Sequence, residues 1–409
     1  MQNIKPIAIY LPQYHTIPEN DKAWGAGFTE WTNVRKAQPV FDGHYQPHIP
    51  HEDVGYYDLR NPEVMVRQAT MAKKFGIYGF AFYHYWFNGK RLLETPLDNM
   101  LKTGSPDFPF LYIWANENWT KRWDGQDNEI IIDQKYTHED DLNHIRFLCE
   151  NVFSDKRYIN IDNKPVFVVY RTELLPNINE TVRIWREEVK KYGFNDLYLI
   201  RVENFKTDIN PSDIGFDASM EFAPESRAVE SKTIGDNNTL NYVIDNEDVV
   251  VNMALSPEKS YPWFRCVSPG WDNSARRSAN AYIYVNNTAL QFKMLFFRAC
   301  RYTERFFNKD SQLLFVNAWN EWGEGCHLEP DKKNGYIYLE QIDEVLNKNT
   351  PKNMDEYIDF IDGLLKSQIN ERKEYLNLKA DYRRIMQSHG HKYMEKALVI
   401  YRGFKRKLK

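Results

Sequence analysis

The stretch NPEVMVRQATMAKKFGIYGFAFYHYWF, residues 61–87, joins a helical pattern directly to a long apolar run. Asn61 can cap the helix, Pro62 suits its first position and Gly76 suits its end, and apolar residues recur at helical spacing between them. Residues 77–87 then form a continuous aromatic and aliphatic run that is typical of a strand. A helix followed at once by such a strand is one unit of an α/β fold.

The same alternation continues along most of the chain. Apolar runs of strand length are separated by longer helical patterns, of which 179–194 and 287–307 are the clearest. Eight strands with helices between them predict a (β/α)8 TIM barrel, whose active site lies at the C-terminal ends of the strands. An open doubly wound sheet is the alternative, but it favours a glycine-rich phosphate turn, and the sequence contains no GxGxxG motif or P-loop. The eight runs are 6–11, 77–87, 108–116, 165–171, 197–204, 217–224, 264–270 and 313–320.

The chain is expected to have two parts. Residues 1–350 are predicted to be the catalytic barrel domain, with polar insertions at 118–160 and 225–262 that would decorate its catalytic face. Residues 351–409 are predicted to be a helical, basic C-terminal extension. It ends in YRGFKRKLK, with five basic residues in nine. Such a tail is usually a solvated helix end, and peripheral contact with an anionic membrane surface is the alternative.

Composition narrows the class of protein. The chain has 409 residues, 42% hydrophobic content and a net charge of −4, which does not suggest a nucleic-acid partner. Four cysteines lie far apart without a CxxC pair, which fits a reducing compartment. We see neither a signal-peptide pattern nor an apolar run of transmembrane length, so the expectation is a cytoplasmic protein.

Carboxylates crowd the end of the last predicted strand, in VNAWNEWGEGCHLEPD (316–331). Like charges repel, so Glu321, Glu324 and Glu329 need either solvent or a function, and a solvated or ion-paired loop is the ordinary interpretation. Glycoside hydrolysis requires two carboxyl groups, one protonated and one ionised. Neighbouring carboxylates push each other's pKa apart and supply both states. Trp322 and the strand-end position favour Glu321 and Glu324 as a catalytic pair.

Aromatic and polar residues also end the other predicted strands. Aromatic residues make up 15% of the chain, and Trp and Tyr can stack on sugar rings as well as pack in a core. At least one of Trp114, Trp119 and Trp123 is expected to be a sugar platform. Arg276 is expected to bind acidic or hydroxyl groups. The predicted substrate-binding set is Glu117, Trp271, Tyr14, Tyr85, Trp86, Trp119, Asn320, Arg276 and Glu329.

The stretch GHYQPHIPHEDVG, residues 43–55, offers His44, His48 and His51 as metal ligands. The prolines place them in an irregular loop, and the sequence marks no second set of ligands. Ordinary loop histidines are therefore favoured, and we expect neither a metal nor a cofactor.

Several of these motifs resemble those of a known family. AWNEWGEGCHLEP (318–330) and VSPGWDNSARR (267–277) resemble the last two strand-end motifs of family 99 glycoside hydrolases, the endo-α-mannosidases. GFTEWTNV (27–34), GHYQPHIP (43–50) and WANENWTKRWDG (114–125) look still closer to WbsX-type proteins, which carry a domain like that of family 99. The resemblance covers roughly residues 5–345.

The resemblance implies a barrel that works without a metal, and retaining hydrolysis through a 1,2-anhydro sugar. Glu321 would deprotonate the 2-hydroxyl of the substrate, and Glu324 would be the acid/base. Glu117 matches a glutamate that contacts the substrate near the 2-hydroxyl, and Trp271 stands where the mannosidases have a tyrosine. Because epoxide formation needs the 2-hydroxyl and the leaving group anti to each other, an α-mannoside or α-rhamnoside linkage is expected.

Two other functions compete with this one. WbsX-type proteins look associated with O-antigen, lipopolysaccharide and other surface-polysaccharide biosynthesis, and are often labelled glycosyltransferases. The sequence shows no DxD-type motif at a strand end and no phosphate-cradling loop. An inactive carbohydrate-binding protein is the other alternative, and intact Glu321 and Glu324 argue against it. We therefore predict a glycosidase whose partner is a polysaccharide or lipid-linked oligosaccharide.

Overall fold

The computed structural model describes most of the predicted barrel region. The described residues are 1, 3–121, 129–204, 209–224, 229–236 and 239–347. The predicted extension, 351–409, and Trp123 lie outside them. Among the described residues, no helix combines the length and the apolar composition that crossing a bilayer requires.

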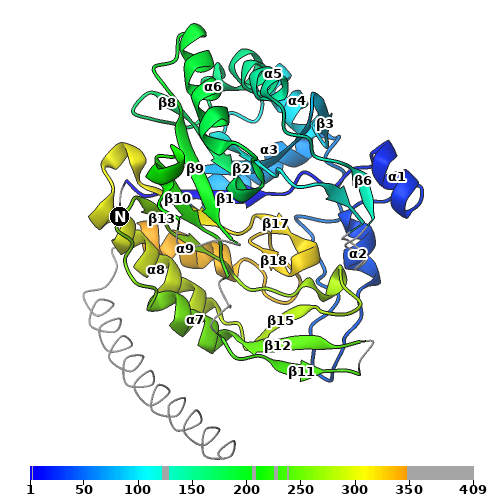
Figure 1. Cartoon of the computed structure of the whole chain (residues 1–409). Helices are drawn as coiled ribbons and strands as arrows, with labels where there is room; N and C mark the ends of the chain where they lie inside the picture. The colour runs from blue at the N-terminus through cyan, green and yellow to red at the C-terminus, as the bar shows by residue number, and fades with distance from the viewer. Residues whose placement is uncertain (2, 122–128, 205–208, 225–228, 237–238, 348–409) are drawn as a thin grey trace, which may run out of the picture. The chain divides into compact units, whose positions relative to one another are not determined.

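A ring of parallel strands with helices around it forms the centre of the protein (Figure 1). The strands follow the order β13-β10-β9-β8-β4-β2-β1-β16-β14. The seventh strand is interrupted at Arg265, so that β13 pairs with β10 while β14 pairs with β16, which closes the ring. The eight predicted runs are the eight strands of this barrel, and the predicted TIM-barrel fold is confirmed. The strands are β1 (Lys5–Tyr10), β2 (Gly79–Phe87), β4 (Phe110–Trp114), β8 (Lys164–Val169), β9 (Tyr198–Glu203), β10 (Ala218–Glu221), β13 (Trp263–Phe264), β14 (Cys266–Val267) and β16 (Leu313–Val316).

The barrel strands are buried on both faces, which explains why they appear in the sequence as continuous apolar runs. All nine residues of β2 are buried. On the outer side of the strands, beneath the helices, the ring of Tyr10 packs 4.7 Å from that of Phe82, centroid to centroid. At the start of β2, a Cβ added to Gly79 would lie 2.6 Å from the carbonyl oxygen of Pro109, so only glycine allows β2 and the segment before β4 to approach this closely.

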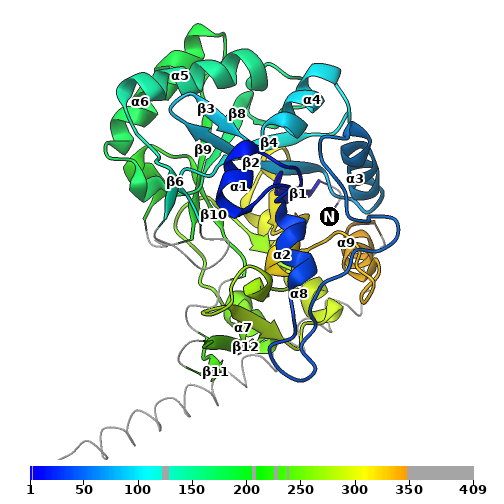
Figure 2. The same cartoon turned by 90° about the vertical axis from the view of Figure 1, so that its right-hand side faces the viewer.

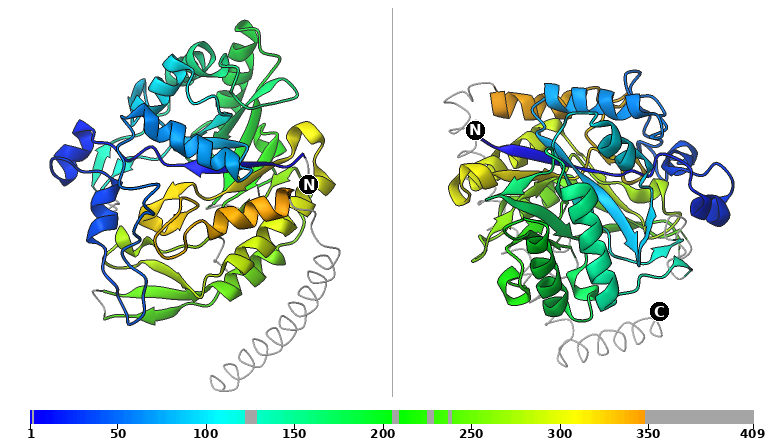
Figure 3. Two further views of the ribbon diagram at one scale, coloured as in Figure 1. Left: turned by 180° about the vertical axis from the view of Figure 1, so that it is seen from behind. Right: turned by 90° about the horizontal axis from the view of Figure 1, so that it is seen from above.

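Helices cover the outside of the ring (Figures 2 and 3). The predicted start of α3 is confirmed, because the side chain of Asn61 accepts a hydrogen bond from the backbone N–H of Glu63 and Pro62 is the first helical residue. The outer helices are α3 (Pro62–Lys74), α4 (Thr95–Thr103), α5 (His138–Leu148), α6 (Ile178–Lys191), α7 (Asn246–Ala254), α8 (Ala289–Phe306) and α9 (Ile337–Asn347).

Additional elements gather at the C-terminal ends of the barrel strands, where the two polar insertions were predicted. The connection from β1 to α3 carries two short helices, and a small three-stranded sheet combines two strands that follow β10 with one that follows β14. The apolar runs predicted only the barrel strands, so these shorter elements are new. They are α1 (Pro18–Trp24), α2 (Glu30–Lys36), β3 (Lys90–Leu92), β5 (Trp119–Thr120), β6 (Ile130–Ile132), β11 (Lys232–Ile234), β12 (Asn241–Asp245), β15 (Tyr282–Val285), β17 (Asn320–Glu321) and β18 (Cys326–His327). A further short strand, β7 (Asn160–Ile161), lies at the opposite end and pairs with the start of β8.

Candidate active site

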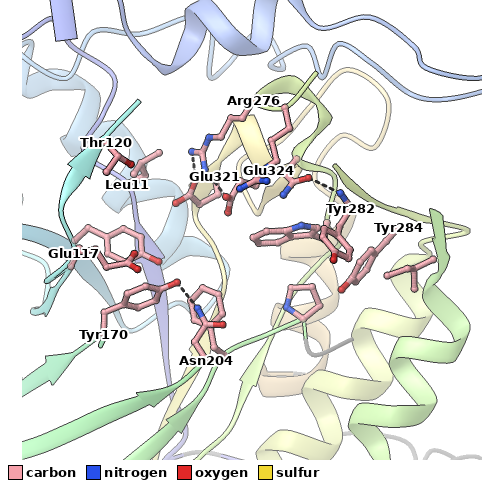
Figure 4. A pocket seen from close by; sticks show the side chains of 18 of the residues that line it. Leu11, Glu117, Thr120, Tyr170, Asn204, Arg276, Tyr282, Tyr284, Glu321 and Glu324 are labelled. Atoms are coloured by element: carbon pink, nitrogen blue, oxygen red, sulfur yellow. Dashed lines mark hydrogen bonds and ion pairs between the residues drawn. The ribbon is translucent and has the colours of Figure 1, made fainter. Parts of the chain in front are cut away.

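A pocket of about 770 Å³ opens at the C-terminal ends of the barrel strands. All eight strands contribute to it, either through their last residues or through the loops that follow them. Figure 4 shows Glu321 and Glu324 beside Arg276, Glu117 with Tyr170 on another wall, and two tyrosines of β15 on a third. The structure thus brings the predicted catalytic pair to the place where TIM barrels carry their active sites.

Arg276 is the centre of a buried charge cluster in this pocket. Its Nη2 donates to Oε2 of Glu321, its Nη1 pairs with Oε1 of Glu324, and its Nε donates to Oε1 of Glu30, all at 2.7 Å. Glu30 is fully buried and Glu321 is 5% exposed, whereas the side chain of Glu324 is 22% exposed toward the pocket. One guanidinium therefore holds three carboxylates in fixed positions.

Arg276 is positioned by the loop that follows β14. The side chain of Asp272 caps a short 3-10 turn, Asn273–Ala275, by accepting from the N–H of Ser274, and Arg276 follows directly. The backbone N–H of Asp272 donates to the carbonyl oxygen of Glu324 at 2.6 Å. His44 also contacts the carboxylate of Asp272, at 2.7 Å. These bonds join the loops that follow β14 and β16.

Sequence reasoning did not identify Glu30 as a site residue. It is the first residue of α2, and Gly323 makes room for it: a Cβ at that glycine would lie 1.7 Å from Oε1 of Glu30. Glycine between Glu321 and Glu324 is thus required by packing. The available signal was the motif GFTEWTNV, which places this glutamate among the residues that carry the family resemblance.

Burial raises the pKa of two carboxyl groups of the cluster, those of Glu321 and Glu30. Burial raises the pKa of Glu321 to about 8; Arg276 opposes this shift, and the charges of Glu324 and Glu30 add to it. Burial also raises the pKa of Glu30, against the effect of Arg276. Because one positive charge does not balance three buried negative ones, the cluster retains a proton near neutral pH.

The wall formed by the loops after β4 and β8 carries a second ion pair. Arg171 binds the carboxylate of Glu117 and, at 2.5 Å, that of Glu173. The backbone N–H of Arg171 donates to the side chain of Asn116, which fixes these two loops to each other. Tyr170, which sequence reasoning did not identify, lines the pocket next to this pair. The carboxylate of Glu117 is therefore held in one orientation, as a group that binds hydroxyls would be.

Aromatic side chains form the rest of the lining. Of the aromatic residues in the predicted substrate-binding set, Trp119 and Tyr85 line the pocket with their rings edge to face, 5.0 Å apart, and Trp271 lines it from the loop after β14. Sequence reasoning missed Tyr282 and Tyr284 on β15. Their alternation in the run AYIYV is a strand signal, but the run is too short and too exposed to stand out from a loop.

The structure places Trp86 outside the pocket. Successive side chains of a strand point to opposite faces, so Trp86 points away from the face that carries Tyr85. Its indole Nε1 donates to Asp140 at 2.8 Å, and its ring stacks on His144 of α5 with centroids 4.7 Å apart. Trp114 is buried as well and does not line the pocket.

Tyr14, Asn320 and Glu329 lie behind the lining rather than in it. The hydroxyl of Tyr14 donates to the carbonyl oxygen of Asn320, and the Asn320 side chain exchanges two hydrogen bonds with the backbone of Leu11. The carboxylate of Glu329 accepts bonds from four buried side chains, and burial raises its pKa to about 7. These three residues hold the loop that carries Glu321 and Glu324. The donors to Glu329 are Tyr57, Gln68, Trp319 and Trp322.

Solved structures with the same fold include glycosidase-like barrels. The family 99 endo-α-mannosidase from Bacteroides thetaiotaomicron superimposes with a TM-score of 0.52 and 14% identity, over 84% of this chain and 96% of that one. A structure described as a glycoside hydrolase-like protein gives a TM-score of 0.52 and 14% identity, over 85% and 94% of the two chains. At this level of identity the likeness concerns the fold.

Proteins related to this chain by sequence have a higher identity to it than these solved structures do. Two proteins described as uncharacterized protein WxcX, from two strains of Xanthomonas campestris pv. campestris, are 39% identical over 348 residues. The match covers 84% of this chain and 49% of each relative, so the chain spans about half the length of the curated relatives it matches. The family model described as "Glycosyltransferase WbsX" matches residues 6–342, which span the barrel strands from Pro6 of β1 onward and include the Arg276 cluster. The chain therefore belongs to the WbsX family.

Proposed function

We propose that this barrel is a glycan-active enzyme, specifically a retaining glycoside hydrolase that cleaves α-mannoside- or α-rhamnoside-type linkages. The observation that supports this proposal is the arrangement of Glu321 and Glu324 on two nitrogens of one guanidinium, at the floor of a pocket lined by aromatic rings. Glycosidases need two such carboxyl groups in different protonation states. A surface polysaccharide or lipid-linked oligosaccharide is the proposed natural substrate.

In the first proposed step, the carboxylate of Glu321 takes the proton of the sugar 2-hydroxyl. The 2-oxygen attacks the anomeric carbon, the bond from that carbon to the glycosidic oxygen breaks, and the carboxylic acid of Glu324 protonates the departing oxygen. The product of this step is a 1,2-anhydro sugar. Glu321 suits the base because burial, which raises its pKa to about 8, makes its carboxylate a stronger base than an ordinary one.

In the second proposed step, the carboxylate of Glu324 takes a proton from water, whose oxygen attacks the anomeric carbon. The bond from that carbon to the 2-oxygen breaks, and Glu321 returns its proton to the 2-oxygen. Both residues end in their starting states, and two inversions give net retention. Arg276 holds the two carboxylates in place during both steps, and Glu117, fixed by Arg171, is available to bind a hydroxyl of the same sugar.

The substrate configuration tests this proposal. Wild-type protein, without nucleotide, is expected to release sugar from members of a panel of α-mannosyl and α-rhamnosyl oligosaccharides and to leave matched α-glucosides intact. In α-glucosides the 2-hydroxyl and the leaving group are not anti to each other, so the epoxide does not form. Equal cleavage of α-glucosides would contradict the mechanism. Absence of any cleavage, together with tight binding of a nucleotide sugar, would favour the transferase activity that the family description names.

The pH dependence of activity depends on Glu321. The proposed first step needs one proton on the pair, carried by Glu324, while Glu321 is ionised. Because the cluster loses this proton as the pH rises through about 8, kcat/KM for a cleaved glycoside is expected to fall as the pH rises through about 8. Changing Glu30 to Gln removes a negative charge that raises this pKa and leaves Arg276 more fully paired with Glu321. Both effects lower the pKa, so the alkaline limb of the profile is expected to move about one unit lower.

The matched control for this profile is Glu188→Gln. Glu188 is a buried carboxylate on α6, where it pairs with Arg146 and Lys191, and it does not line the pocket. This variant should keep the wild-type pH profile. A wild-type alkaline limb far from a pH of about 8, or the same displacement in both variants, would argue against the assignment of Glu321.

A further inference from the structure

A second cluster of chemically active side chains lies outside the residues that line the pocket. His48 comes from the loop between α2 and α3, His327 from β18, and Asp331 from the segment that follows β18. His327 and Asp331 are buried and His48 is half-buried. The sequence brought His48 to attention, but the two partners lie at the other end of the barrel domain.

The ligand atoms of these three residues converge. Nδ1 of His48 lies 2.9 Å from Nε2 of His327, which in turn lies 3.9 Å from Oδ2 of Asp331. One ligand atom of each residue can be chosen so that all three atoms lie within 4.8 Å of one another. In a tetrahedral zinc site with bonds of about 2.0–2.1 Å, neighbouring ligand atoms are about 3.3 Å apart. Small movements of these side chains would therefore give the required spacing.

The hydrogen bonds around the cluster leave more acceptors than protons inside it. Nδ1 of His327 lies 2.8 Å from the carbonyl oxygen of Glu329, so it carries the proton and leaves Nε2 with a lone pair. The carboxylate of Asp331 accepts from the backbone and side chain of Asn334 and faces the same space. The proton between the two rings therefore lies on Nδ1 of His48, which donates to Nε2 of His327. A divalent cation that displaces this proton would bind all three ligand atoms at once.

We infer that His48, His327 and Asp331 form a binding site for a divalent transition-metal ion of the zinc type. Two imidazole nitrogens and one carboxylate oxygen are ligands that favour such ions over Mg²⁺ or Ca²⁺. The hydrogen bond from His327 to the Glu329 carbonyl is the outer contact that orients a metal-binding histidine. Three protein ligands leave one position for a water molecule.

A metal ion at this site would stabilise the structure and would take no direct part in the proposed reaction. None of its three residues lines the pocket. His327, however, stacks on Trp322 with ring centroids 3.7 Å apart, and Trp322 stands between Glu321 and Gly323. A bound ion would fasten the loop that carries His48 to the loop that carries the catalytic pair. The inference stands on this geometry and does not depend on which reaction the barrel performs.

Metal binding to the full chain tests the inference. Protein treated with EDTA and then dialysed is titrated with Zn²⁺, with Mg²⁺ as the comparison, and both the bound metal and the melting temperature are measured. We expect about one Zn²⁺ per chain and a rise in Tm with Zn²⁺ alone, because an ion that binds only the folded state stabilises it. Co²⁺ in place of Zn²⁺ should give visible absorption bands of a low-coordinate nitrogen and oxygen site.

Substitutions of His48 and Asp331 test whether these residues are ligands of the bound metal ion. His48→Gln and Asp331→Asn should each weaken Zn²⁺ binding about tenfold or more and reduce the rise in Tm. His51→Gln is the matched control, because His51 belongs to the same loop, contacts Asp53 at 3.3 Å, and is not one of the cluster residues. The inference is wrong if wild-type protein gains no stability from Zn²⁺ and shows no cobalt bands. It is also wrong if both His48→Gln and Asp331→Asn bind Zn²⁺ as tightly as the wild type does.

Discussion

Replacing Glu321 or Glu324 by Gln is expected to lower kcat for glycoside cleavage by about 10²–10⁴-fold, because each change removes a proton-transfer group without changing its shape. The two variants should differ in how the loss depends on the leaving group. Glu324→Gln lacks the acid that protonates the departing oxygen, so an activated aryl glycoside should restore much of its first step. Glu321→Gln lacks the base, and the same substrate should restore little. The measurement is kcat for an aryl glycoside and for a matched alkyl glycoside or oligosaccharide.

Glu173→Gln is a useful comparison for this pair. Glu173 shares Arg171 with Glu117 but is not one of the pocket residues, so its loss should have a much smaller effect on kcat. If Glu321→Gln and Glu324→Gln keep wild-type activity, the catalytic assignment fails. If both lose activity equally on every leaving group, the division of roles between them fails, although the pair itself stands.

The Arg276→Met variant is expected to be less stable than the wild type by about 3–5 kcal/mol, because it leaves three carboxylates of a buried cluster without their cation. The loss should depend on pH. Without Arg276, the folded-state pKa of Glu30 and Glu321 rises further above the unfolded value, and such groups stabilise the fold at low pH and lose that effect as the pH rises. Urea unfolding at pH 5 and pH 8 should therefore show the larger loss at pH 8.

Two further variants test whether unpaired buried carboxylates cause the loss of stability in Arg276→Met. Glu30→Gln added to Arg276→Met removes one uncompensated carboxylate and should recover part of the lost stability. Arg183→Met is the exposed comparison: Arg183 also pairs with two glutamates, on the surface of α6, and its replacement should leave stability nearly unchanged. Equal losses for Arg276→Met and Arg183→Met would show that burial of the cluster contributes little.

The sequence predicted the barrel because each of its strands is buried on both faces and so appears as a separate apolar run. It also predicted the pair Glu321 and Glu324, which are close in sequence and follow a strand. Glu30 escaped prediction because it meets Arg276 across 246 residues of chain, and only the closed ring brings them together. Trp86 was placed in the site because a fully buried strand shows no alternation of polar and apolar residues, so the sequence does not reveal which face a side chain takes.

The small sheet of β11, β12 and β15 places the aromatic Tyr282 and Tyr284 in the pocket without taking part in the ring of barrel strands. Its strands belong to the insertions after the sixth and seventh barrel strands, whereas Glu321 and Glu324 follow the eighth. Substitutions of Tyr282 and Tyr284 can therefore reshape this wall of the pocket while Glu321 and Glu324 stay in place. Under the proposed function, glycan preference could then evolve in this sheet without any change in the segment that carries the two glutamates, whereas Arg276 precedes β15 in the same insertion.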